Sequence, residues 1–342
     1  MQNRRHFLQT GFSMAAAGLA GAAALTGARR TLAEEAPPET TLVRILSYKN
    51  AITCIAPLDI LDDLLRDEGF VEISYVIGAD SDIPTERVGR GDVDFGQEFS
   101  SVTTLLVDAG VPAVMLAGVH TGCFELFARE SIRSVVDLKG KTLGVVDTSS
   151  ASSEVLMLKI IAASVGLDPA REINWVATGS GDPKDLLADA KIDAFMAFTP
   201  YAQELRALAT GHVILSSALD RPWSQYLCCM LIGNADFVRS KPIATKRVVR
   251  AMMRATDICA AKPDWVTQRL VDRGFTPRYD YARQGMDDLS YRAWREYDAE
   301  DSVRFYALRL RELAMIKSSP DKIIATGTDW RFIKEVKKEL GI

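Results

Sequence analysis

Apolar and polar residues follow one another in short segments that switch repeatedly between the period of a strand and that of a helix. Residues 41–46 alternate as a half-buried strand does, and residues 55–65 repeat apolar side chains at helical spacing. The succession continues with predicted strands at 71–77 and 93–95, a helix at 101–109 and an apolar run at 113–119. This alternation predicts an α/β protein with mostly parallel sheets and helices on both faces.

A second series of the same kind begins near residue 137. It predicts strands at 142–146, 173–177 and 192–196, with helices after residue 152 and at 182–190 and 202–209. The continuous apolar run 226–232 is typical of a strand buried on both faces, and the remainder to residue 342 is mainly helical. From about Trp223 the chain is therefore expected to return to the unit in which it began.

The first thirty-three residues have the pattern of an export signal. Asn3-Arg4-Arg5 precedes an Ala- and Gly-rich run from Phe12 to Gly27, and Thr31-Leu32-Ala33 is a small-x-small ending. This pattern resembles a twin-arginine signal cleaved near Ala33. A membrane anchor is the alternative, but Ala and Gly gain little on transfer into lipid.

Charge and composition narrow the functional classes. The formal net charge is −4, with 48% hydrophobic and 25% charged residues, so the chain is globular in composition and not disordered. Removal of the predicted signal takes away four arginines and no acid, which leaves the remainder more acidic. An acidic surface is a poor partner for nucleic acid.

The five cysteines are Cys54, Cys123, Cys228, Cys229 and Cys259. Their spacing contains no C-x-x-C pair and no histidine at a zinc-ligand spacing, so no metal site is expected. Cys228 and Cys229 are neighbours in a predicted strand and should point to opposite faces, each packing as a small hydrophobe. The disulfide state of the five remains open.

Four short motifs give the chain a family resemblance over nearly all of residues 41–340. It resembles the periplasmic solute-binding proteins of ABC importers in the nitrate, sulfonate, taurine and pyrimidine-precursor group (SsuA/THI5-like, NMT1). The motifs are Gly91-Asp92-Val93-Asp94-Phe95-Gly96, Asp137-Leu138-Lys139-Gly140-Lys141-Thr142-Leu143-Gly144-Val145, Gly166-Leu167-Asp168-Pro169, and Lys191-Ile192-Asp193-Ala194-Phe195-Met196-Ala197-Phe198-Thr199-Pro200-Tyr201.

The resemblance implies a two-lobed periplasmic-binding-protein fold of type II with a ligand cleft between the lobes. Lobe 1 would comprise residues 41–127 and 224–342, and lobe 2 residues 128–223, with crossings near Phe127-Ala128 and from Ser217 to Ser224. It also implies a periplasmic, monomeric, non-enzymatic protein without a cofactor that hands a small solute to ABC permease subunits. Export would use the twin-arginine (Tat) machinery.

Candidate ligand-binding residues are those that follow predicted strands, because ligands of parallel sheets bind beyond the carboxyl ends of strands. The serine-rich turn could present hydroxyls and helix N-terminal amides to a carboxylate, sulfonate or ring carbonyl, or could be a plain N-cap. His120 is either a ligand contact or a structural histidine. The candidates are Tyr48, Asn50, Gln97, Phe99, Ser100, His120, Thr121, Thr148, Ser149, Ser152, Phe198, Thr199 and Tyr201.

Two alternative functions fit the same fold. One is an enzyme like the pyrimidine-precursor synthases of the family, although the sequence shows no cysteine-rich cluster of the kind those enzymes use and no compelling lysine for a pyridoxal Schiff base. The other is a ligand-sensing module that reports to a membrane receptor. A bound chromophore or metal would favour the enzyme, and reversible solute binding would count against it.

Overall fold

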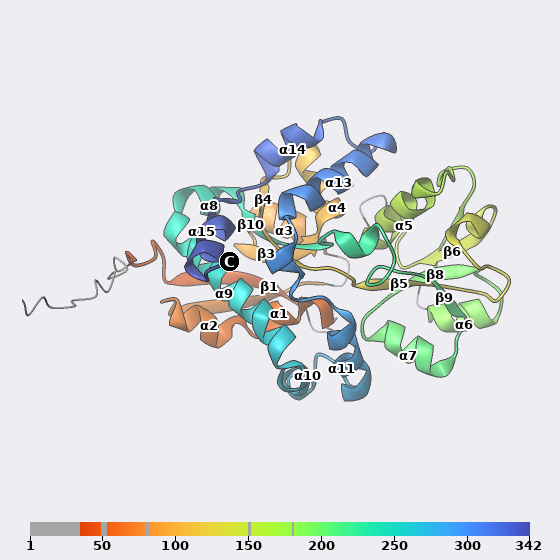
Figure 1. Cartoon of the computed structure of the whole chain (residues 1–342), viewed down its shortest axis with the longest axis horizontal. Coiled ribbons are helices and arrows are strands. Elements are labelled where there is room, and N and C mark those ends of the chain that lie inside the picture. The colour runs from red at the N-terminus through yellow and green to blue at the C-terminus, as the bar shows by residue number, and fades with distance from the viewer. Residues whose placement is uncertain (1–34, 49–52, 80–81, 150–151, 180) are drawn as a thin grey trace, which may run out of the picture. The chain divides into compact units, whose positions relative to one another are not determined.

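Two five-stranded sheets organise the described residues between Pro37 and Ile342 (Figure 1). The computed structural model describes residues 35–48, 53–79, 82–149, 152–179 and 181–342, so the predicted export signal lies outside the described residues. The first sheet has the order β2-β1-β3-β10-β4 and the second β7-β6-β8-β5-β9. The strands are β1 Leu42–Ser47, β2 Glu72–Ile77, β3 Phe95–Phe99, β4 Ala113–His120, β5 Phe124–Ala128, β6 Thr142–Val145, β7 Asn174–Ala177, β8 Ala194–Phe198, β9 His212–Ser216 and β10 Cys229–Asn234.

Both sheets are mixed, and each has a single strand that runs against the others. β1 pairs in parallel with β2 and β3, and β6 pairs in parallel with β7 and β8. β10 is antiparallel to β3 and β4, as β5 is to β8 and β9. Four strands of each sheet therefore share one direction, which confirms the predicted mostly parallel, two-lobed α/β fold of type II.

Helices cover the sheets on both faces. α3 packs with α4, and α9 packs with α1 and α2; Figure 1 shows the two groups on opposite sides of the first sheet. Within the described part of the chain, no helix is both long and apolar enough to cross a membrane. The helices are α1 Ala56–Asp59, α2 Leu61–Asp67, α3 Pro84–Arg90, α4 Ser100–Asp108, α5 Ser153–Ser164, α6 Pro183–Ala188, α7 Tyr201–Leu208, α8 Ala235–Ser240, α9 Pro242–Ala261, α10 Pro263–Asp272, α11 Tyr279–Asp288, α12 Ala293–Glu296, α13 Ala299–Glu312, α14 Pro320–Gly327 and α15 Arg331–Glu339, with short 3-10 turns at Thr53–Ile55, Val135–Leu138 and Trp223–Gln225.

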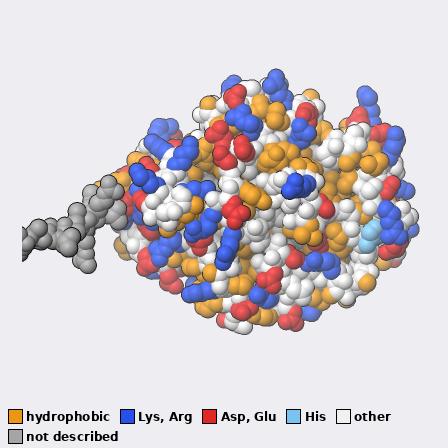
Figure 2. All heavy atoms as spheres, viewed as in Figure 1, with side chains coloured by type: hydrophobic (Ala, Val, Ile, Leu, Met, Phe, Trp, Pro, Cys, Tyr) orange, Lys and Arg blue, Asp and Glu red, His pale blue; other side chains and the backbone are white. Residues whose placement is uncertain are grey.

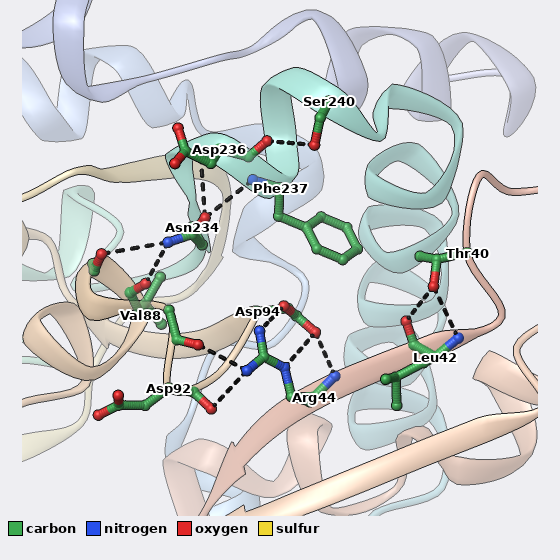
Figure 3. A network of polar contacts seen from close by, with 12 residues as sticks. Thr40, Leu42, Arg44, Val88, Asp92, Asp94, Asn234, Asp236, Phe237 and Ser240 are labelled. Carbon is green, nitrogen blue, oxygen red and sulfur yellow. Dashed lines mark hydrogen bonds and ion pairs between the residues drawn. The ribbon is translucent and has the colours of Figure 1, made fainter.

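In each sheet, an aspartate just before one strand accepts hydrogen bonds from the start of the neighbouring parallel strand. Asp94, just before β3, accepts hydrogen bonds from the backbone N–H of Arg44 at 2.8 Å and from its guanidinium at 2.6 Å (Figure 3). In the second sheet Asp193, just before β8, accepts a hydrogen bond from the backbone N–H of Thr142 at 2.9 Å. Each carboxylate thus ties the start of one strand to its parallel neighbour, which explains physically why two of the recognised motifs contain an aspartate at this place.

The chain crosses between the sheets earlier than the sequence predicted. The crossing expected near Phe127-Ala128 lies before Phe124, because all of β5 pairs with β8 and β9 of the second sheet. The apolar sequence of β5 reads equally well as the end of either unit, and only pairing decides. The return crossing lies between the end of β9 at Ser216 and the start of β10 at Cys229.

The two crossings are bonded to each other. The hydroxyl of Ser217 donates to the carbonyl oxygen of Phe124 at 2.8 Å and accepts from its N–H at 3.0 Å. Gly122 sits beside them with φ +75°, and a Cβ added there would lie 2.8 Å from the Cα of Ala218. The place where the chain passes twice between the sheets is therefore closely packed.

Gly122→Ala should lower the free energy of unfolding by about 2–4 kcal/mol, because the left-handed backbone costs a non-glycine residue about 1–2 kcal/mol and the backbone clash adds to it. Gly140→Ala is the matched control, since its φ is +72° but a Cβ there would meet nothing within 4 Å. Urea unfolding of both variants isolates the clash. Equal losses of unfolding free energy in the two variants would show that the crossing segments move aside for the added Cβ without an energetic cost.

Candidate functional site

A hollow opens at the carboxyl ends of the strands of the first sheet. It has a volume of about 240 Å³ and includes the last residues of β3 and the segment that follows β1. Ser153, the first residue of α5, borders it from the side of the second sheet. The lining residues are Tyr48, Cys54, Ile55, Asp82, Pro84, Gln97, Glu98, Phe99, Ser153 and Cys229.

An adjoining hollow of about 550 Å³ extends along the ends of β6 and β8 of the second sheet. The two hollows share Asp82, Pro84, Glu98 and Ser153, so we treat them as one cleft. The second hollow is lined by Asp82, Ile83, Pro84, Glu98, Val102, Val146, Asp147, Ser149, Ser152, Ser153, Glu154 and Phe198. Strand ends from both sheets therefore meet at one concave site, as expected for a ligand-binding α/β protein.

Two aromatic rings meet across the cleft. Phe99 ends β3 of the first sheet and Phe198 ends β8 of the second, and their ring centroids are 5.8 Å apart at a tilted angle. Tyr48 contributes a third ring to the lining. Faces of this kind suit an apolar or planar part of a small molecule and also attract cations.

Four acidic side chains line the cleft, and the described lining residues include no Lys, Arg or His. Asp82 is ion-paired with Arg87 on α3. Glu98, only 7% exposed, accepts a hydrogen bond from the backbone N–H of Phe99 at 2.7 Å, and burial raises its pKa to about 8. No ion pair to Glu98 occurs within the described residues. The cleft therefore holds a desolvated acid that has no cation beside it among the described residues and whose neutral form burial favours.

The second sheet contributes the other two acids. Glu154 lies in the first turn of α5 and accepts from the backbone N–H of Val146 at 2.8 Å; burial raises its pKa. Asp147 accepts from the N–H of Ser149 at 3.0 Å, and its hydrogen bonds with Ser149 lower its pKa. The first turn of α5 offers N–H donors to a ligand, but it already carries a carboxylate of its own.

Gln97 supplies an acceptor that lacks a partner. Its Nε2 donates to the carbonyl oxygen of Cys54 at 2.9 Å, which leaves Oε1 as the other end of the amide. Oε1 is buried and accepts no hydrogen bond from the described residues, and the residue, 4% exposed, borders the cleft. A buried acceptor without a donor is costly, so a ligand with a hydrogen-bond donor would satisfy it.

The predicted candidates separate into three groups. Tyr48, Gln97, Phe99, Ser149, Ser152 and Phe198 border the cleft, and their contact with a ligand remains a prediction. Asn50 lies outside the described residues. The rest lie off the cleft lining: Ser100, His120, Thr121, Thr148, Thr199 and Tyr201.

Local contacts explain why these other side chains lie elsewhere. The hydroxyl of Ser100 donates to the carbonyl oxygen of Leu227, and that of Tyr201 donates to Asp182. Thr199 accepts a hydrogen bond at 2.5 Å from the hydroxyl of Thr53. The other three side chains are also placed away from the cleft lining: His120 and Thr121 are buried beneath it, and Thr148 is exposed outside it.

Sequence reasoning passed over the acids Asp82, Glu98, Asp147 and Glu154. Glu98 stands between two predicted candidates, so its place after a strand was the available signal. The strand ends at Phe99, and the consecutive residues Gln97, Glu98 and Phe99 all line the hollow, whereas Ser100, the first residue of α4, does not. Asp147 and Glu154 flank the serine-rich turn that was expected to hold an electronegative group.

The expected arrangement of the cysteines is wrong. Cys228 precedes β10, so it does not alternate with Cys229 as strand neighbours do, and their Sγ atoms are 3.7 Å apart. Cys123 Sγ lies 3.4 Å from that of Cys228 and 3.8 Å from that of Cys229. Hydrogen bonds from Cys123 and Cys229 lower the pKa of the nearby Cys54 thiol to about 6. A cysteine-rich cluster that the sequence did not suggest therefore exists in three dimensions.

Charged side chains of both signs are intermixed on the face shown in Figure 2. Many form ion pairs, such as Lys246 with Glu339 at 2.7 Å and Arg295 with Asp257 at 2.5 Å. A further hollow of about 240 Å³ lies among α12, α13 and α15 and is bordered by Trp294, Asp298 and Lys337. It is not at the strand ends, and we assign the ligand site to the cleft.

Residues 65–265 match the family model described as NMT1/THI5 like, and the chain belongs to this family. It is 26% identical over 186 residues to binding proteins of Brucella abortus and Brucella suis, across 53% of this chain and 56% of theirs. The chain thus spans about half the length of the curated relatives it matches.

Solved structures share the fold at low sequence identity. The periplasmic nitrate-binding protein NrtA of Synechocystis PCC 6803 matches with a TM-score of 0.74 at 13% identity, covering 89% of this chain and 90% of that one. The aliphatic sulphonate-binding protein SsuA of Escherichia coli has a TM-score of 0.64 at 15% identity, with 83% and 91% covered. The desulfurization enzyme DSZB has a TM-score of 0.58 at 13% identity, with 87% and 99% covered.

Proposed function

We propose that this protein is the solute-binding component of an ABC-type importer and that its cleft takes a small organic solute rich in hydrogen-bond donors or positively charged. The observation that carries the proposal is the cleft where the strand ends of both sheets meet, lined by acids and by the unpartnered acceptor of Gln97. Its two hollows, of about 240 and 550 Å³, suit a metabolite-sized ligand.

The charge of the described lining argues for a donor-rich solute. Burial raises the pKa of Glu98 to about 8, so an anion beside it would have to keep the acid protonated, because like charges at short distance in a poorly hydrated site repel strongly. A cationic or amino group would instead pair with the carboxylate of Glu98 and donate a hydrogen bond to Oε1 of Gln97. It would also contact the rings of Phe99 and Phe198. NrtA is a nitrate-binding and SsuA a sulphonate-binding protein, and both of these ligands are anions, so the cleft here would have a different specificity.

Transport would follow from movement of the two sheets. The crossings at Thr121–Cys123 and 217–228 are the two covalent passages between them, so a small backbone rotation there would open or close the cleft. Closure would bury the solute and shape the surface that permease subunits recognise. In this scheme a division into two lobes, with the first crossing before Phe124, remains part of the proposal, as do an export signal, a monomeric state and the absence of catalysis.

Export by a twin-arginine signal cleaved near Ala33 would place the protein in the periplasm, where solute-binding proteins of importers work. The family match and the structural similarity to periplasmic binding proteins support this location. The enzyme alternative draws its support from the shared fold of DSZB. A receptor-linked sensing role would use the same cleft and differ only in the membrane partner.

The decisive experiment compares ligands that share a skeleton but differ in charge. Benzylamine, benzoate and benzenesulfonate form one set, and ethylamine and ethanesulfonate a second; nitrate, aminopyrimidines and diamines extend the panel. A ligand at 100 times its dissociation constant should stabilise the native protein by about 2.7 kcal/mol in a thermal unfolding assay. We expect saturable stabilisation by an amine and none by its anionic counterpart, with stoichiometry checked by calorimetry.

The outcomes separate the two parts of the proposal. Tight binding of a sulfonate, carboxylate or nitrate would keep the solute-binding role and overturn the assignment of charge. Consumption of an added compound, followed by mass spectrometry, would establish an enzyme and overturn the role itself.

A further inference from the structure

Four side chains with metal-ligating atoms converge where the chain crosses between the sheets. They are His120 at the end of β4, Cys123 just after it, Cys228 just before β10 and Cys229 at the start of β10. Their ligand atoms all lie within 4.8 Å of one another, and each residue is at most 2% exposed. The cluster is thus assembled from the two crossing segments and lies beneath the cleft.

The spacing of the sulfurs is that of a tetrahedral site. Zinc–sulfur bonds of about 2.3 Å in a tetrahedron place neighbouring sulfurs about 3.8 Å apart, and a sulfur about 3.6 Å from a histidine nitrogen. The Sγ distances are 3.4 Å for Cys123 to Cys228, 3.8 Å for Cys123 to Cys229 and 3.7 Å for Cys228 to Cys229. Cys228 Sγ is 3.7 Å from His120 Nδ1.

The surroundings of His120 orient its ring for this role. Nε2 lies 3.0 Å from the carbonyl oxygen of Cys54, its shortest polar contact, while Nδ1 lies 3.3 Å from the carbonyl oxygen of Thr121 and 3.7 Å from the thiol of Cys228. A proton on Nε2 donated to the carbonyl oxygen of Cys54 leaves the lone pair on Nδ1, on the side of the sulfurs. An outer hydrogen bond from a metal-bound histidine to a backbone carbonyl is the usual way in which its tautomer is fixed.

Two cysteines are not among these four residues: Cys54 contacts Cys123 and Cys229, whereas Cys259 shows what packing alone would look like. Cys259 lies on α9, is fully buried, and has no sulfur or histidine ligand atom grouped with it within the described structure. Apolar burial of a thiol does not require three sulfurs to face one another, or an imidazole nitrogen to complete a fourth corner. The convergence therefore calls for a cause other than filling the core.

We propose that Cys123, Cys228, Cys229 and His120 form a site for one thiophilic divalent metal ion, zinc by the tetrahedral S3N donor set, that fastens the two crossings together. Binding would release the thiol protons to solvent as the three sulfurs become thiolates. Cys54 and Cys229 border the cleft, so the ion would reach the site from there. Such a site goes beyond solute binding and does not depend on it.

The test uses the full chain and two metals. Purified under reducing conditions without a metal-affinity step, it should contain about one zinc per chain by plasma mass spectrometry, or take up one equivalent when titrated. Replacement by Co²⁺ should give the thiolate-to-metal charge-transfer band and strong visible bands of a tetrahedral cobalt site. Cys228→Ser and Cys123→Ser should each weaken zinc binding by more than the about 100-fold that loss of an outer-shell partner costs.

Cys259→Ser is the matched control and should bind zinc as the parent chain does, because this buried thiol lies outside the cluster. Circular dichroism verifies that each variant is folded, and the cobalt spectrum of the unaltered chain does not depend on any variant. Three results would overturn the site: no uptake of zinc or cobalt by the reduced chain, zinc affinity unchanged in both Cys228→Ser and Cys123→Ser, or an octahedral cobalt spectrum.

Discussion

Glu98→Gln is expected to reduce the affinity for an amine ligand by about 100-fold or more. The carboxylate is 7% exposed and, in the described structure, has no cation beside it, so a bound cation would be its charge partner. Loss of one member of a desolvated charge pair costs about 2–5 kcal/mol. The amide keeps the shape of the side chain and can still accept from the N–H of Phe99. Calorimetry at pH 8.5, above the pKa of about 8, measures the effect with the acid ionised.

Asp147→Asn is the matched control because it removes a carboxylate from the same cleft at an exposed position, where charge interactions are worth less than about 1 kcal/mol. Asp147→Asn should reduce the affinity for the same amine ligand only a few-fold. The proposed ligand charge would be contradicted if Glu98→Gln left amine binding unchanged. Stronger binding of benzoate or benzenesulfonate in Glu98→Gln, in contrast, would support it, since the repelling charge is gone.

Much of the fold could be predicted because several strands of the first sheet have clear patterns. The alternation at 41–46 and the apolar run at 113–119 correspond to β1 and β4, and their order with the helices between them implied parallel sheets. β5 and β9 were missed. Their sequences, such as Phe124–Ala128, carry no information about which sheet they join, since that depends on pairing with β8.

The candidate site was less accessible to sequence reasoning. Gln97, Phe99 and Phe198 follow strands and could be chosen by that rule, but the rule also selected Ser100, whose hydroxyl bonds to the backbone of Leu227. The cysteine cluster could not be read from spacing, because Cys123 and Cys228 are 105 residues apart and meet only where the chain crosses twice. Contacts of that range depend on the arrangement of both sheets.

Asp59→Asn should remove a pH dependence that the parent chain shows between about pH 4 and pH 8. Asp59 ends α1, is 1% exposed, and neither carboxylate oxygen has a hydrogen-bond partner of good geometry in the described structure. Burial raises its pKa from 3.8 to about 8, and the charge of Arg273 and the nearby hydroxyl of Ser47 offset this only in part. The fold therefore favours the protonated acid.

Between these pH values the folded state holds a proton that the unfolded chain has lost, so unfolding becomes easier as pH rises. The penalty is at most about 1.4 kcal/mol per pH unit and is complete above the folded pKa. In urea unfolding, the unfolding free energy of Asp59→Asn relative to that of the parent chain should rise by about 3–5 kcal/mol from pH 4 to pH 8. Asp67→Asn, an exposed acid on the neighbouring α2, should leave the difference within about 0.5 kcal/mol. Parallel curves of unfolding free energy against pH for Asp59→Asn and the parent chain would contradict this prediction. They would mean that Asp59 is already ionised in the folded protein, with a positive charge close enough to stabilise the carboxylate.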